Sequence, residues 1–199
     1  MKIILDSPIN KYYVQTLGMI FFPGAHFSES EELADGEPSL FVKTTEEETG
    51  IRAFVYVTVD EKSESAEHFV AYNPDRTKER VIKLAIGGAI LIAFEALLSY
   101  RPAWGMMMGV RPAKIASEML DMGYSKTRVK KILSSDYFVI PKKAALATSI
   151  ALTERSIIAK LSPKDCSVYI AIPFCPSRCA YCSFVSYTSK RLLDTIPDY

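Results

Sequence analysis

Three of the four cysteines of this chain lie close together near its end, at Cys175, Cys179 and Cys182, with the spacing C-x3-C-x2-C. Thiolates are soft ligands that hold zinc ions and iron–sulfur clusters. In a chain of 199 residues with four cysteines, chance would produce this spacing with a probability of roughly 0.002, so a shared chemical task explains it better.

Three kinds of thiol chemistry compete for this motif. A disulfide is a poor fit, because the N-terminus MKIILDSPINKYY lacks the features of a secretory signal and the expected compartment is the reducing cytoplasm. Structural zinc needs four ligands, and the fourth cysteine, Cys166, precedes an expected strand at 167–172 that would hold it roughly 20 Å from the loop. A [4Fe–4S] cluster held by three thiolates leaves one iron open for a substrate or cofactor. We favour this last hypothesis and keep a structural zinc-binding module as an alternative.

The segment YIAIPFC (169–175) leads directly into the cysteine loop and alternates like a β-strand. This order would place the metal at the C-terminal end of a strand, where barrel-type α/β enzymes keep their active sites.

At this point the residues resemble a known superfamily. The motif C-x3-C-x2-C with an aromatic residue, Tyr181, directly before its last cysteine resembles the radical S-adenosylmethionine (SAM) motif. The strand YIAIPFC is similar to the corresponding strand of oxygen-independent coproporphyrinogen III oxidases, also called dehydrogenases. Together with the segment WGMMMGVRP (104–112), it most resembles the HemZ-type branch of that family.

The resemblance implies a role for each matching position. Cys175, Cys179 and Cys182 would ligate three irons of a [4Fe–4S] cluster, and SAM would chelate the fourth iron. Three aromatic residues would surround this centre: Tyr181 at the adenine of SAM, Tyr169 beside the cluster and the sulfonium, and Phe174 as a shield against water. No catalytic residue is assigned.

The resemblance also implies an oxidoreductase of haem biosynthesis in the cytoplasm that converts propionate side chains of a porphyrinogen into vinyl groups by oxidative decarboxylation. A reductant such as flavodoxin or ferredoxin would supply the electrons. Two positions depart from the family pattern: Ala171 stands where histidine is usual, and Phe184 stands where the oxidases carry another cysteine. A haem chaperone-like radical SAM protein without oxidase activity, which also has phenylalanine at the latter position, is therefore a second alternative.

The rest of the chain predicts an α+β fold in three regions. Residues 1–76 are expected to form a small α+β region with an antiparallel sheet, residues 77–163 a helical region, and residues 164–199 the first β-loop-α unit of a truncated radical SAM (TIM-like) barrel. We therefore expect this chain to be the N-terminal part of a longer enzyme and to be inactive alone. The expected strands are 1–6, 39–45, 51–59 and 66–72, and the expected helices are 9–23, 78–100, 112–123, 125–137 and 141–161.

Charge and hydropathy argue against nucleic-acid and membrane partners. The formal net charge is +1, from 24 basic and 23 acidic side chains, so no overall field attracts a polyanion. The most apolar run, 84–94, is shorter than the about 20 residues that a helix needs to cross a bilayer, and it predicts a buried helix. Within it, Gly87 and Gly88 indicate close approach to another helix. The basic residues of 126–131 are expected to form a solvated face.

Overall fold

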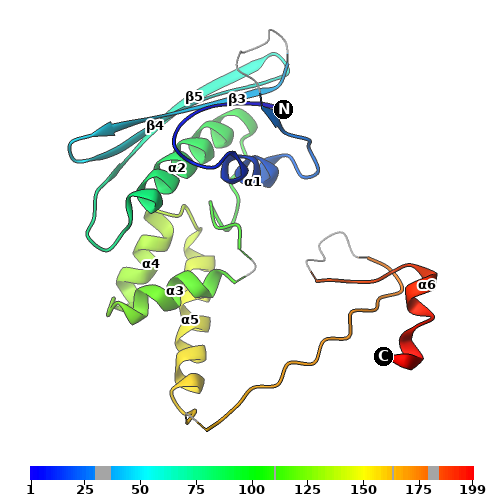
Figure 1. Ribbon diagram of the computed structural model, residues 1–199. Helices are drawn as coiled ribbons and strands as arrows, with labels where there is room; N and C mark the ends of the chain where they lie inside the picture. The colour runs from blue at the N-terminus through cyan, green and yellow to red at the C-terminus, as the bar shows by residue number, and fades with distance from the viewer. Residues whose placement is uncertain (30–36, 110, 163, 179–183) are drawn as a thin grey trace. The chain divides into compact units, whose positions relative to one another are not determined.

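The computed structural model describes residues 1–29, 37–109, 111–162, 164–178 and 184–199 (Figure 1). The chain divides into two compact units, Met1–Ala159 and Lys160–Tyr199. The first unit is a mixed α+β fold, as the sequence predicts, and the boundaries at 76/77 and 163/164 remain predictions.

The first unit contains a five-stranded sheet with the order β2-β1-β3-β4-β5. Its last three strands form the predicted antiparallel meander. The prediction of an antiparallel sheet is wrong for the part that contains β1 and β2, because β1 runs parallel to both β2 and β3. Helix α1 follows β1 and carries the chain back across the sheet, and such a crossover makes parallel pairing possible. The strands are β1 (Lys2–Asp6), β2 (Ser28–Glu29), β3 (Ser39–Glu47), β4 (Gly50–Val59) and β5 (Lys62–Ala71), and α1 spans Lys11–Phe21.

Short polar turns fix the register of the meander. Glu48 and Thr49 connect the paired residues at the end of β3 and the start of β4. Asp60 and Glu61 connect β4 to β5, and the backbone φ of Asp60 is 54°, which suits the tight turns of β-hairpins. With this register, alternate residues of β4 point into the core.

Helix α2 (Lys78–Leu98) forms the second layer and packs mainly on β4 and β5 (Figure 1). The Thr77 side chain caps its first turn by accepting a hydrogen bond from the Arg80 N–H. By length and composition α2 could cross a membrane, but 72% of its most apolar window is buried within the protein. The prediction of a buried core helix is therefore confirmed.

The glycine pair of α2 allows close approach, as predicted, although its neighbours come from the sheet and a loop as well as a helix. A Cβ atom on Gly87 would lie 2.8 Å from the Met106 sulfur and 3.0 Å from the Tyr13 hydroxyl of α1. A Cβ atom on Gly88 would lie 2.2 Å from the His68 ring of β5. Any side chain larger than hydrogen would therefore push the sheet and the helix apart.

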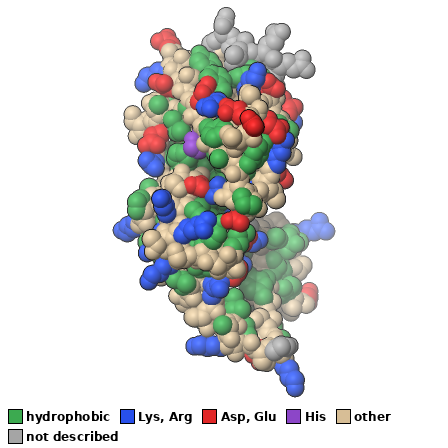
Figure 2. All heavy atoms as spheres, turned by 90° about the vertical axis from the view of Figure 1, so that its left-hand side faces the viewer, with side chains coloured by type: hydrophobic (Ala, Val, Ile, Leu, Met, Phe, Trp, Pro, Cys, Tyr) green, Lys and Arg blue, Asp and Glu red, His purple; other side chains and the backbone are tan. Residues whose placement is uncertain are grey.

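Three further helices, α3 (Pro112–Asp121), α4 (Lys126–Ser135) and α5 (Pro141–Ile158), pack on one another. The Ser125 hydroxyl caps α4 by accepting a hydrogen bond from the Arg128 N–H at 3.2 Å, as the sequence predicts. All four cations of α4 are exposed, as expected for a solvated face. The face of the molecule in Figure 2 shows Lys and Arg interspersed with other side chains, below a group of acidic ones.

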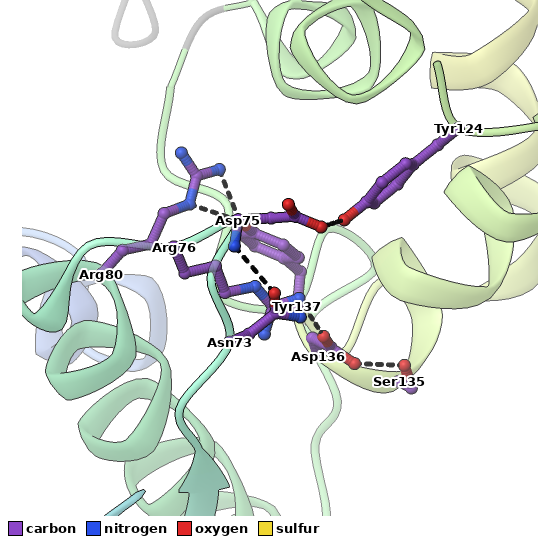
Figure 3. A network of polar contacts seen from close by, with 8 residues as sticks. All are labelled: Asn73, Asp75, Arg76, Arg80, Tyr124, Ser135, Asp136 and Tyr137. Carbon is purple, nitrogen blue, oxygen red and sulfur yellow. Dashed lines mark hydrogen bonds and ion pairs between the residues drawn. The ribbon is translucent and has the colours of Figure 1, made fainter. Parts of the chain in front are cut away.

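A polar network ties these helices to α2 and to the loop before it (Figure 3). Arg76, on the loop before α2, forms an ion pair with Asp136, which follows α4. On the same loop, the Asp75 carboxylate accepts a hydrogen bond from the Tyr124 hydroxyl. The Arg80 Nε donates to the hydroxyl oxygen of the buried Tyr137 at 2.9 Å. Within the first unit, α2 and the loop before it are therefore held to the helical group by charge-assisted bonds.

The second unit has little regular structure in its described residues, where α6 (Lys190–Leu193) and a 3₁₀ turn (Ile196–Asp198) are its helical segments. The strand expected at 167–172 is not formed, and Val168, Tyr169 and Ile170 are each 80–81% exposed. A strand is stabilised by a ladder with a neighbour. The described part of this unit offers a single isolated bridge, between Phe174 and Tyr187. A truncated radical SAM barrel is therefore not confirmed.

Candidate metal centre

The cysteine motif begins directly after that bridge. The Cys175 N–H donates to the Tyr187 carbonyl at 3.1 Å, and the Tyr187 N–H donates to the Pro173 carbonyl at 2.7 Å. These two bonds join the ends of the segment 175–187, in which all three cysteines of the motif lie. The thiol of Cys175 is partly exposed and is not in a disulfide, so it is free to act as a ligand.

Phe174 stands at the centre of a small aromatic cluster. Its ring lies 6.0 Å from that of Tyr187 and 5.2 Å, edge to face, from that of Tyr199. The Tyr199 hydroxyl also donates to the Ala171 carbonyl at 2.8 Å. Phe174 is therefore anchored next to Cys175, at a position from which it could shield that side of the loop from water.

The two tyrosines were not predicted from the sequence. Tyr187 and Tyr199 share no periodicity with the segment 169–175, and they approach Phe174 only because the chain turns back on itself. No local pattern marks that turn, so a single sequence carries no signal that would have found them.

The structure describes only part of the predicted ligand set. Cys179, Tyr181 and Cys182 lie outside the described residues. Tyr169 is 80% exposed, and among the described residues its ring makes no stacking contact or hydrogen bond, so the structure does not bring it to Phe174. Where the chain is described, no three His, Cys, Asp or Glu side chains gather as a metal site.

The second unit has no hydrophobic core in its described part. It spans Lys160–Tyr199, and every described residue in it is exposed or only partly buried. Units of about 40 residues or fewer usually need a disulfide, a metal or a partner to be stable. A ligand that joined the three cysteines would therefore supply both chemistry and stability.

The predicted site can also be compared with known proteins. The chain is 28% identical over 180 residues to the oxygen-independent coproporphyrinogen-III oxidase-like protein HemZ of Bacillus subtilis (strain 168). The match covers 87% of this chain but 35% of HemZ, so the chain spans about a third of the length of this relative. No family model and no solved structure matches the chain. The similarity to HemZ confirms the resemblance to the HemZ-type branch that the cysteine motif and its strand first indicated.

Proposed function

We propose that this chain carries the cluster-binding loop of a HemZ-type radical SAM protein, with Cys175, Cys179 and Cys182 as the iron ligands. The observation that carries the proposal is the C-x3-C-x2-C spacing, in a chain of which 87% matches HemZ.

The donor set suits such a cluster. Three thiolates match three of the four irons and leave one position for the amino and carboxylate groups of SAM. When bound, the cluster and SAM would supply one-electron chemistry that starts radical reactions. The Cys175 thiol is free, while its backbone is held by Tyr187, so this ligand would keep its position whether or not metal is bound.

The aromatic residues would control access to the centre. Phe174, fixed between Tyr187 and Tyr199, would exclude water beside Cys175. Tyr181 would lie at the adenine of SAM. For Tyr169 to lie beside the cluster, its exposed segment would have to be covered on binding.

For the whole protein, we propose oxidative decarboxylation of coproporphyrinogen propionates to vinyl groups in the cytoplasm, with flavodoxin or ferredoxin as the electron donor. The description of HemZ as coproporphyrinogen-III oxidase-like supports this substrate class. A haem chaperone-like function is the second candidate, and the phenylalanine at position 184 favours it. Assays of the full-length protein separate the two: vinyl products support the oxidase, whereas haem binding without decarboxylation supports the chaperone. The 199-residue chain alone should release no 5′-deoxyadenosine above background.

Reconstitution tests the ligand assignment. The chain is loaded anaerobically with iron and sulfide, and metal content, visible absorption and electron paramagnetic resonance are measured with and without SAM. We expect about four irons per chain in the parent protein and in the control Cys166→Ala. Iron should be lost in Cys175→Ala, Cys179→Ala and Cys182→Ala. Zinc in place of iron, loss of the cluster in the Cys166 variant, or a spectrum that SAM leaves unchanged would refute the assignment.

A further inference from the structure

The first unit contains a cavity lined by residues other than those proposed for the cysteine site. It lies between α1, α2, α3 and residues 106–108, and its volume is about 480 Å³. Small-molecule sites are typically about 300–1,000 Å³ in volume, mostly apolar, and carry a few well-placed polar groups. Both the size and the lining of this cavity fit that description.

One wall of the cavity is apolar and adaptable. Leu84, Met106, Met107 and Ile115 contribute to it. Methionine side chains are flexible and polarisable, so they can adjust to the shape of an apolar ligand. The wall stands where it does because Gly87 has no side chain, since a Cβ there would meet the sulfur of Met106.

The charged groups at the cavity leave one cation unmatched. The Lys83 ammonium lies 2.5 Å from the Glu79 carboxylate. The Arg80 guanidinium lies 3.6 Å from the Glu118 carboxylate and also donates a hydrogen bond to the Tyr137 hydroxyl oxygen. Lys114, exposed in the first turn of α3, has no carboxylate partner among the residues that the structure describes. The cavity therefore carries one net positive charge.

The phenol deep in the cavity adds no negative charge to it. The Tyr13 hydroxyl donates to the Lys83 carbonyl at 2.8 Å. Burial raises the pKa of Tyr13 well above its usual value, with a smaller contribution from Tyr137. Because Tyr13 stays neutral, the positive charge of Lys114 remains available to a ligand.

We infer that this cavity binds an organic acid with an apolar body, and specifically the carboxylate-bearing edge of a tetrapyrrole. The ring would lie against the methionine wall, and a propionate carboxylate would pair with Lys114. The general class follows from the cavity, whereas the choice of a tetrapyrrole rests on the proposed function.

Titration of the 199-residue chain with coproporphyrin III, followed by porphyrin absorption and fluorescence, tests the inference. Lys114→Gln should weaken binding about tenfold, the value of one charge-assisted contact of about 1.4 kcal/mol. Ile115→Trp should abolish binding by filling the cavity, with circular dichroism to verify its fold. Lys126→Gln, an exposed lysine of α4 outside the cavity, should bind within twofold of the parent chain.

A second probe isolates the role of the carboxylates. The tetra-amide of coproporphyrin III has the same ring but no negative charge, and Lys114→Gln should leave its affinity unchanged. Equal affinities of all variants for coproporphyrin, or no binding to the parent chain, would overturn the inference. Because the titration uses metal-free protein, its outcome is independent of the cluster: binding without a reconstituted cluster would support the cavity and not the proposed function, and the reverse result would do the opposite.

Discussion

The contact between Gly88 and His68 offers a sharp test of the packing of α2 on the sheet. A Cβ atom on Gly88 would lie 2.2, 2.7 and 2.8 Å from three atoms of the His68 ring. The His68 ring also packs edge to face on Phe138, with 5.4 Å between the ring centroids, and this contact restricts its movement. Gly88→Ala should therefore force the helix and the sheet apart.

Two opposing effects determine the free energy of unfolding of Gly88→Ala. Overpacking a core costs about 1–3 kcal/mol, whereas replacing glycine by alanine within a helix gains about 1 kcal/mol. The net change should lie between neutral and a loss of about 2 kcal/mol. In the His68→Ala background the clash is absent, so the same substitution should stabilise the protein by about 1 kcal/mol.

A double-mutant cycle measures this coupling. The free energy of unfolding of the parent, both single variants and the double variant is obtained from urea titrations monitored by circular dichroism. The coupling energy should be about 1–3 kcal/mol, the cost of the overpacking alone. Gly18→Ala serves as the control, because its close neighbour is the ring of Phe27 rather than His68. If the effect of Gly88→Ala is the same in both backgrounds, the packing of α2 described above is wrong.

Three further predictions address the core, the pH dependence and the polar network. Phe94→Ala, which removes a wholly buried ring stacked on Phe21 at 4.6 Å, should reduce the free energy of unfolding by about 3–5 kcal/mol, and a loss below about 1 kcal/mol in a urea titration would contradict this packing. Burial lowers the pKa of His68 below 6.5, with Asp136 opposing, so the unfolded chain binds this proton more tightly and stability should decrease as the pH falls below about 6.5. This slope should be smaller in His68→Phe, and equal slopes would show that His68 is not its source. Asp136→Asn should cost about 1–3 kcal/mol because the side chains of Arg76 and Asp136 are only 14% and 28% exposed, and an unchanged unfolding midpoint would assign the pair no role in stability.

The elements of the first unit could be predicted because their signals are local. The start of α4 follows from the Ser125 cap, and the meander follows from apolar runs separated by polar turns. The parallel pairing of β1 with β3 could not be predicted in this way. It depends on which distant strands meet, and the intervening helix permits this partner without specifying it.

For the candidate site, the sequence predicts a set of ligands but not their surroundings. Cysteine spacing is a property of the chain alone, whereas the positions of Tyr187 and Tyr199 depend on a turn without a sequence signature. For the segment 167–172, by contrast, the sequence predicts a strand that the structure does not contain. Its apolar residues favour a strand, but strand formation depends on a neighbour, and the described residues of the second unit supply none.

The bonds between Cys175, Tyr187 and Pro173 have a consequence for the order of assembly. Bringing the two ends of a loop together is one part of the conformational entropy that a chain loses when it wraps around an ion. Here the ends of the segment are already joined. The joined ends would therefore lower the entropic cost of binding an inorganic group, because this part of the cost is already spent when the polypeptide folds.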